Sequence, residues 1–170
     1  MEKFHCVMGV LPQFGGLKKL QRQIPDEVVY TGPGFGRVLD PHVTLLYGLH
    51  NENDYFAVRR ILQEIKSIPI TLGELKKFTS PEYDVIVIDI LSEACTMVHN
   101  KIKEQCENTQ TYDSYSPHLT IAYVLPGSCE YLINNKSFEG EEFNIKDCVF
   151  NLADDSMDIP IPVGKYGKKV

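Results

Sequence analysis

The chain contains a seven-residue phrase that occurs twice. Residues 41–47 read PHVTLLY and residues 117–123 read PHLTIAY, so proline, histidine, threonine and tyrosine match in place. The three remaining positions are apolar in both copies. The phrases use two of only five histidines, and these two lie 76 positions apart, near half the chain length. Such a repeat indicates two related halves of one chain, each presenting the same side chains.

Both phrases are rich in β-branched and aromatic residues, which favours strands. Side chains alternate between the two faces of a strand, so His42 and Thr44 share one face. His118 and Thr120 share a face in the same way. The apolar positions between them and the tyrosine that ends each phrase are expected to point the other way, into a core. Each half therefore offers one imidazole and one hydroxyl side by side.

Two such pairs facing each other suit the cleavage of a phosphoester without a metal. A neutral imidazole takes a proton from the attacking oxygen, and a protonated one gives a proton to the leaving oxygen. Threonine hydroxyls donate hydrogen bonds to phosphoryl oxygens on which charge develops. The repeat makes the histidines nearly equivalent, so which one is the acid stays open. Two alternatives also stay open. In one, the histidines are structural residues of core strands with satisfied hydrogen bonds. In the other, they bind zinc, although no third ligand accompanies the phrases.

Two H-x-T motifs in strands, about half a chain apart, resemble the two-histidine (2H) phosphoesterases, also described as RNA-ligase-like or cyclic phosphodiesterases. The small bacteriophage members, which include enzymes that disarm CBASS defence, are similar to this chain over residues 41–50, 83–90 and 116–124. The resemblance carries the catalytic roles of the family over to His42, Thr44, His118 and Thr120.

The resemblance also implies a fold and an activity. The fold would be α+β, with two pseudo-symmetric lobes, two antiparallel sheets flanked by helices, and a central cleft. The activity would be cleavage of a small nucleotide or a cyclic oligonucleotide signal, as in phage counter-defence, without cofactor or metal. RNA-derived substrates, either 2′,3′-cyclic phosphates or 2′,5′-linked oligoadenylates, are the alternative. A protein that sequesters a nucleotide without turnover is an alternative of another class.

The elements that position these residues follow from the pattern of apolar side chains. Runs of paired strands with few helices favour an α+β architecture with antiparallel sheet. Residues 1–170 are expected to form a single bilobed domain, with residues 164–170 as a flexible basic tail. Helices are expected over residues 17–23, 54–66 and 92–106, and strands over residues 4–11, 43–47, 68–78, 83–91, 119–124, 143–152 and 157–163.

The amino-acid composition narrows the class of ligand and the cellular compartment that we expect. The chain has 170 residues, with 17 Lys and Arg against 23 Asp and Glu, a net charge of −6. This balance disfavours long nucleic acid, whose binding depends on neutralising many phosphates, and leaves a short nucleotide as the expected ligand. No apolar run reaches the ~18 residues of a membrane helix, and the first residues do not resemble a signal peptide. The five cysteines lack metal spacing, which is typical of reduced, mostly buried thiols in a cytoplasmic protein, located in the host cytoplasm if the protein is viral. A monomer or weak oligomer is expected.

Four further residues are candidates for contact with substrate. The loop at residues 31–37 (TGPGFGR) leads into the first phrase, so Phe35 and Arg37 are expected near the mouth of the cleft. This loop is not a P-loop, because it lacks the Gly-Lys-Ser/Thr ending and precedes a strand. Tyr112 and Tyr115 precede the second phrase, where an aromatic ring could stack on a nucleobase. The histidines without a companion phrase are expected to be structural or exposed: His5, His50 and His99.

Overall fold

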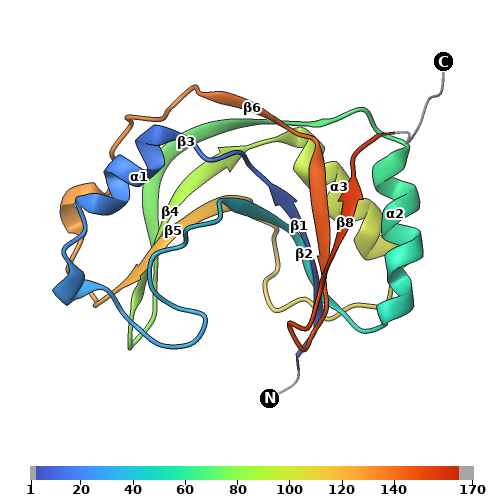
Figure 1. Cartoon of the computed structure of the whole chain (residues 1–170), viewed down its shortest axis with the longest axis horizontal. Helices are drawn as coiled ribbons and strands as arrows, with labels where there is room; N and C mark the ends of the chain where they lie inside the picture. The colour runs from blue at the N-terminus through green and yellow to red at the C-terminus, as the bar shows by residue number, and fades with distance from the viewer. Residues whose placement is uncertain (1–2, 165–170) are drawn as a thin grey trace.

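The computed structural model describes residues 3–164, so residues 165–170 of the expected tail lie outside the described residues. Within these residues, eight strands form one antiparallel sheet that curls into an arch, and three α-helices lie on its outer side (Figure 1). The fold is α+β, as predicted. The helices are α1 (Gly15–Arg22), α2 (Tyr55–Gln63) and α3 (Glu93–Gln105). The strands are β1 (His5–Val10), β2 (His42–Leu49), β3 (Ile68–Thr79), β4 (Asp84–Leu91), β5 (His118–Val124), β6 (Glu142–Ile145), β7 (Asp147–Asn151) and β8 (Asp158–Pro162).

The sheet is built from two halves with the repeat at its centre. Its strand order is β6-β3-β4-β5-β2-β1-β7-β8, so the two motif strands, β5 and β2, are neighbours. Val43 and Leu119 form the one residue pair recorded between these strands. Where the resemblance implied two sheets, the structure joins two four-stranded halves into a single sheet through this pair. The two motif strands occupy the centre of this order, and each pairs on its outer side with the strand that precedes it in the chain.

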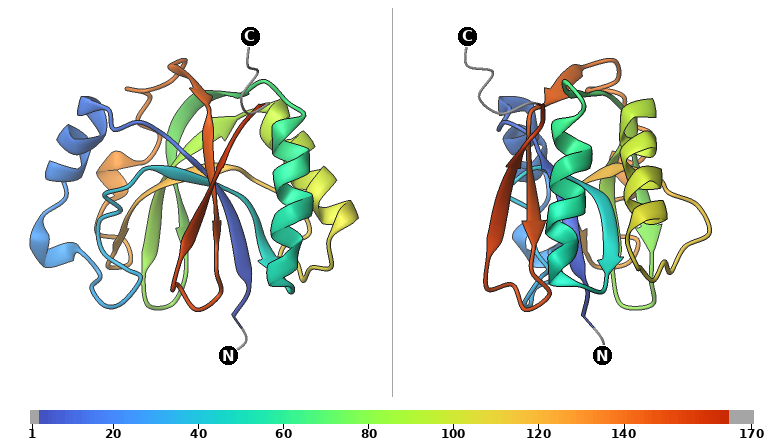
Figure 2. Two further views of the ribbon diagram at one scale, coloured as in Figure 1. Left: turned by 45° about the vertical axis from the view of Figure 1, so that its right-hand side comes forward. Right: turned by 90° about the vertical axis from the view of Figure 1, so that its right-hand side faces the viewer.

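The expected strand over residues 143–152 is two strands that belong to opposite halves. β6 pairs with β3 at one edge of the sheet, whereas β7 pairs with β1 in the other half. The change of partner falls at Lys146, whose carbonyl accepts a hydrogen bond from the Val163 N–H at 2.8 Å. Apolar alternation continues across the break, so periodicity alone did not reveal it. In Figure 2, β7 and β8 stand beside α2, and contacts join β8 to that helix.

The core fills the space between the convex face of the sheet and the helices. Each helix turns an apolar stripe toward the sheet, with Leu17 and Leu20 on α1 and Ile102 on α3 among the buried residues. Ser92 caps α3 by accepting a hydrogen bond from the Cys95 N–H at 3.0 Å. All five cysteines are buried free thiols, as predicted. Within residues 3–164, no helix combines the length and apolar character needed to cross a membrane.

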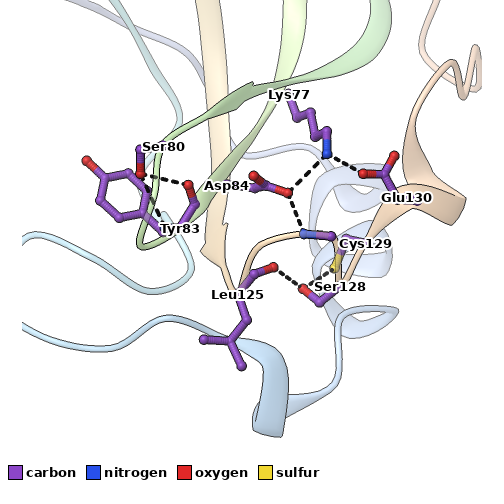
Figure 3. Close-up of polar contacts among 9 residues, drawn as sticks. Lys77, Ser80, Tyr83, Asp84, Leu125, Ser128, Cys129 and Glu130 are labelled. Carbon is purple, nitrogen blue, oxygen red and sulfur yellow. Dashed lines mark hydrogen bonds and ion pairs between the residues drawn. The ribbon is translucent and has the colours of Figure 1, made fainter.

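A buried carboxylate fixes the end of the β3–β4 hairpin. Asp84 pairs with the Lys77 ammonium at 3.2 Å and accepts a hydrogen bond from the Gly127 N–H at 2.9 Å (Figure 3). Lys77 also pairs with Glu130, beyond the end of β5. Because the buried charge of Asp84 is both paired and hydrogen-bonded, its burial is compensated. The network holds the hairpin against the segment that follows β5.

Candidate active site

The site is organised around the contact between β2 and β5. Val43 on β2 lies opposite Leu119 on β5, and both side chains are fully buried on the core side of the sheet. Side chains on either side of a strand residue point to the other face. The residues flanking this pair therefore point to the face opposite the helices. That face is the concave side of the arch in Figure 1.

The four motif residues meet on that concave face. Residues that flank a paired position in antiparallel strands face one another in crossed order. The Val43–Leu119 register therefore sets His42 across from Thr120 and Thr44 across from His118. All four side chains are half-buried. The two histidines therefore occupy diagonal corners of a four-residue set, and the two threonines occupy the other corners. The structure brings together the four residues that the repeat singled out.

Both histidines are oriented by the same hydrogen bond. The Nδ1 atom of His42 lies 2.9 Å from the Asp40 carbonyl oxygen, and the Nδ1 atom of His118 lies 2.9 Å from the Ser116 carbonyl oxygen. A carbonyl oxygen only accepts, so each Nδ1 carries a proton and donates it. The other ring nitrogen, Nε2, is then the one that gains and loses a proton. Both rings are thus prepared for acid–base chemistry through Nε2.

The surroundings of the two histidines differ. The ring of Phe78 meets that of His118 edge-on, with centroids 4.9 Å apart. Asp89 of β4 lies opposite His118 and pairs with the Lys76 ammonium at 2.9 Å. The pKa of His118 is lowered, mainly by burial. The hydrogen bond to Ser116 and the charge of Asp89 act in the opposite direction, and the nearby Lys76 adds to the lowering. His118 is therefore biased toward the neutral form that a general base requires.

The corresponding neighbours of His42 are apolar. Val10 of β1 lies opposite His42, in the position that Asp89 holds beside His118. Met8 lies opposite Thr44. The repeat is therefore symmetric in its four central residues and asymmetric in its next neighbours, so the two histidines occupy distinct environments.

Each motif strand contains a β-bulge at the same place. On β2 the ladder to β1 steps from Thr44 to Leu46 and leaves Leu45 without a partner. On β5 the ladder to β4 steps from Thr120 to Ala122 and leaves Ile121 without a partner. A bulge bends the strand and shifts the alternation of the residues that follow.

The bulges change the direction of two tyrosines. Tyr47 and Tyr123 were expected to point into the core, and this expectation is wrong. Tyr47 is 48% exposed and Tyr123 is half-buried. Their ladder partners, Cys6 and Val85, place both tyrosines on the face of the histidines. Since the two strands run antiparallel, the tyrosines lie beyond opposite ends of the four-residue set.

Aromatic rings gather around both tyrosines. Tyr123 belongs to a cluster with Tyr30, Phe35 and Tyr83, in which the edge-on Phe35–Tyr30 and Phe35–Tyr123 contacts have centroids 4.9 and 5.2 Å apart. Phe35 remains 37% exposed. We call these four residues the Phe35 cluster. The concave face thus carries aromatic surface at this end of the four-residue set.

At the other end, the ring of Tyr47 meets that of Phe4 edge-on, with centroids 5.8 Å apart. Phe4 in turn stacks on His50 at 5.3 Å. His50 is held by Glu107 and Thr109 through its two ring nitrogens, at 3.0 and 2.7 Å. This second group of rings gives the four-residue set an aromatic neighbour on both sides.

The other candidate residues lie in different places. The Arg37 guanidinium pairs with Asp26 at 2.7 Å and donates to backbone carbonyls at and just beyond the end of α1, and its contact with substrate stays a prediction. Tyr115 is packed against the core beneath the sheet and donates its hydroxyl to the Thr44 carbonyl at 2.8 Å. Its ring is therefore not available to a nucleobase on the concave face. Tyr112 is 82% exposed.

The three remaining histidines have structural contacts, as expected. His5 accepts a hydrogen bond from the Ala153 N–H, and His99 is buried beneath β2. Over residues 3–164, no three His, Cys, Asp or Glu side chains are grouped so that they could hold a metal ion.

Comparisons with known proteins give one family and several structures of the same fold. The family model of the 2′-5′ RNA ligase superfamily matches residues 17–141. Usb1 from Kluyveromyces marxianus aligns with a TM-score of 0.67 and 9% identity, and a second Usb1 structure, with uridine monophosphate, aligns at 0.62 and 12%. Both alignments cover 95% of this chain and 98% of the Usb1 chain.

A structure described as a phosphoesterase aligns with a TM-score of 0.57 and 10% identity, covering 97% of this chain and 98% of that one. No curated protein matches the sequence. The structural likenesses establish a shared fold, and the family model covers well over half of the chain. The chain therefore belongs to the 2′-5′ RNA ligase superfamily, the two-histidine phosphoesterases, and is an enzyme of that type.

Proposed function

We propose that this enzyme is a metal-independent phosphodiesterase that cleaves a short nucleotide substrate, with a cyclic oligonucleotide signal as the first candidate. The observation that carries the proposal is the Val43–Leu119 pair, whose register sets His42, Thr44, His118 and Thr120 in crossed order on one face. Both imidazoles present Nε2 for proton transfer, because the Nδ1 proton of each is held by a backbone carbonyl.

The arrangement supports a concerted transfer of two protons. His118, biased toward its neutral form, takes a proton on Nε2 from the attacking hydroxyl. Protonated His42 gives its Nε2 proton to the leaving oxygen. Because the histidines stand at diagonal corners, they can reach opposite sides of one phosphoryl group. Thr44 and Thr120 are then placed to donate hydrogen bonds to its other oxygens.

The attacking oxygen is either water or the substrate's own 2′-hydroxyl. With the 2′-hydroxyl, the P–O bond to the leaving nucleoside breaks while the bond to the 2′-oxygen forms, and a cyclic phosphate results. His118 ends protonated and His42 ends neutral. Proton exchange with solvent resets both rings before the next turnover.

The aromatic surfaces support a substrate with a base on each side of the phosphate. The Phe35 cluster and the Tyr47–Phe4 pair lie beyond opposite ends of the catalytic set, and stacking on such rings contributes roughly 1–3 kcal/mol per base. A Usb1 structure of the same fold was determined with uridine monophosphate, a ligand of the same chemical class. The acidic net charge of −6 favours a short substrate over long nucleic acid.

The test is a substrate panel in the presence of EDTA, with products identified by mass spectrometry. The panel contains cyclic di- and trinucleotides, 2′,5′-oligoadenylates and 2′,3′-cyclic nucleotides. Cleavage of a cyclic oligonucleotide is the expected result, and it is the activity that a phage counter-defence role requires. Cleavage confined to the other two classes would replace that substrate with an RNA-derived one. Stoichiometric binding without turnover, or inactivity across the panel, would overturn the proposal.

Histidine variants connect the activity to the site. His42→Ala and His118→Ala are each expected to lower kcat by about 10²–10⁴-fold, the usual contribution of a general acid or base. His5→Asn is the matched control, since an amide oxygen can replace the ring nitrogen that accepts from Ala153 at 2.9 Å. That control is expected to keep wild-type kcat.

A further inference from the structure

Two buried polar side chains contact the bulges of the motif strands. Gln21, Asp84 and His99 are the buried polar or charged residues of the described part of the chain. Asp84 is paired with Lys77. The other two lie on α1 and α3, and each approaches the carbonyl of one bulge residue. His99 Nδ1 lies 2.7 Å from the Leu45 oxygen, and Gln21 Nε2 lies 3.1 Å from the Ile121 oxygen.

We infer that His99 and Gln21 are positioning residues that lock the two bulges and thereby hold the reacting side chains on the concave face. A bulge residue leaves the strand ladder, so its carbonyl needs another donor. Leu45 and Ile121 are both fully buried, where a carbonyl without a partner is costly. The two helices supply one donor to each half.

His99 holds its bulge together with Tyr115. The two rings stack with centroids 4.1 Å apart and an interplanar angle of 7°. Tyr115 donates its hydroxyl to the Thr44 carbonyl at 2.8 Å, next to the carbonyl that His99 holds. Burial lowers the pKa of His99, so its ring stays neutral and its single ring proton goes to Leu45. The stacked pair therefore fixes the backbone of Thr44 itself.

Gln21 has a related role on β5, where the carbonyl that it contacts also has a second hydrogen-bond donor. Its amide also donates to the Val38 carbonyl at 2.6 Å, so it ties the loop before β2 to β5. The Val38 N–H donates to the Ile121 oxygen at 2.9 Å, which gives that carbonyl a second donor. Loss of Gln21 is therefore expected to have a smaller effect than loss of His99.

The bulge matters for the reaction because it decides which face each residue uses. Without it, the strand would return to simple alternation, and a one-residue change of register moves side chains to the other face. The side chains of Thr44 and Tyr47 share the concave face only because Leu45 is inserted between them. Loosening the bulge is thus expected to misplace the hydroxyl and the aromatic surface without removing either.

Three variants on α3 separate positioning from stability. His99→Leu removes the donor at similar volume, and His99→Asn returns an N–H close to the place of Nδ1. Ile102→Ala is the matched control, because Ile102 is fully buried on the same helix and its side chain is aliphatic. All variants are compared at temperatures equally far below their own Tm.

Hydrogen exchange measured by mass spectrometry needs no substrate. His99→Leu is expected to speed exchange in residues 42–49 at least tenfold, His99→Asn to restore most protection, and Ile102→Ala to leave this segment near wild type. Gln21→Met is expected to act in the same direction, more weakly, on residues 118–124. If His99→Leu and Ile102→Ala change the segment equally, the inference is wrong. If His99→Leu does not fold, His99→Asn carries the test. Loss of protection in that variant, which keeps an N–H donor, would overturn the inference.

The kinetic arm rests on the proposed function. With whichever cyclic oligonucleotide, oligoadenylate or cyclic nucleotide the wild type cleaves, His99→Leu is expected to lower kcat about 10–100-fold with little change in KM, since small misplacements of reacting groups cost about that much. Ile102→Ala is expected to keep kcat within about threefold. An equal loss of kcat in both variants would overturn positioning. Inactivity of the wild type would count against the proposed function alone, because hydrogen exchange still tests the lock.

Discussion

Val43 lies opposite Leu119 at the centre of the sheet, and this pair sets the composition of the site. Each histidine of the repeat faces the threonine of the other copy rather than its own. The catalytic set is therefore composite, because each facing pair, His42 with Thr120 and Thr44 with His118, takes one residue from each half. Changes that shift β2 against β5 would disturb both pairs together.

Thr44 and Thr120 are expected to act through their hydroxyls. Thr44→Val and Thr120→Val keep the branched shape and remove the donor, so each is expected to lower kcat by about 10²–10³-fold, as for the loss of one donor to a developing charge. Serine variants are expected to keep most activity. Thr71→Val, in the groove between β3, β6 and α3, is the control. Unchanged kcat in both valine variants of the motifs would contradict this role.

The assignment of His118 as the base predicts the pH profile. Because burial lowers the pKa of His118 below the ordinary 6.5 of imidazole, the acidic limb of kcat/KM is expected below pH 6.5. Phe78→Ser exposes the ring that Phe78 now covers, and the limb is expected to move up toward that value. An acidic limb above 6.5 in the wild type would indicate that His118 is not the base.

Stability is also expected to depend on pH through buried histidines. Burial lowers the pKa of both His99 and His118 in the folded protein, so below pH 6.5 the unfolded chain binds protons that the folded chain does not. Their contribution is complete above 6.5 and is lost as the pH falls toward their folded values. The free energy of unfolding in urea is expected to fall as the pH decreases from about 6.5 to about 5.5. His118→Asn is expected to reduce that slope, and an unchanged slope would refute the linkage.

Gly48 is required for the contact between β2 and the segment that precedes β5. Its φ is +120°, and a Cβ there would lie 2.1 Å from the Thr109 carbonyl oxygen. Gly48→Ala is therefore expected to lower Tm markedly and to loosen this contact. Gly15→Ala at the start of α1 is the control, because open space surrounds that position and alanine favours a helix. Equal Tm values for the two variants would contradict the prediction.

The stability that the Asp84–Lys77–Glu130 network provides is expected to depend mainly on Asp84, its buried member. The Asp84 side chain is 3% exposed and the Glu130 side chain is 57% exposed, although both pair with Lys77. Asp84→Asn removes a buried charge from a paired site and is expected to lower Tm by several degrees. Glu130→Gln changes an exposed partner of the same ammonium and is expected to have little effect. The reverse order in a thermal unfolding experiment would show that the hairpin is held in another way.

Much of the site was determined by the sequence itself. A repeated phrase with two-residue alternation is enough to place His42 beside Thr44 and His118 beside Thr120, because both relationships are local. The strands and helices were also predicted largely in place, since apolar periodicity is local. The same logic failed over residues 143–152, where alternation continues while the strand partner changes.

Only the tertiary structure decided the rest. A bulge is a property of two paired strands, so neither Leu45 nor Ile121 could be recognised as one from its own neighbours. The donors to these carbonyls, His99 and Gln21, lie 54 and 100 positions away along the chain. Tyr47 points to the catalytic face because of such long-range pairing. The repeat thus determined which residues do the chemistry, and packing between distant segments decided which face and which neighbours they have.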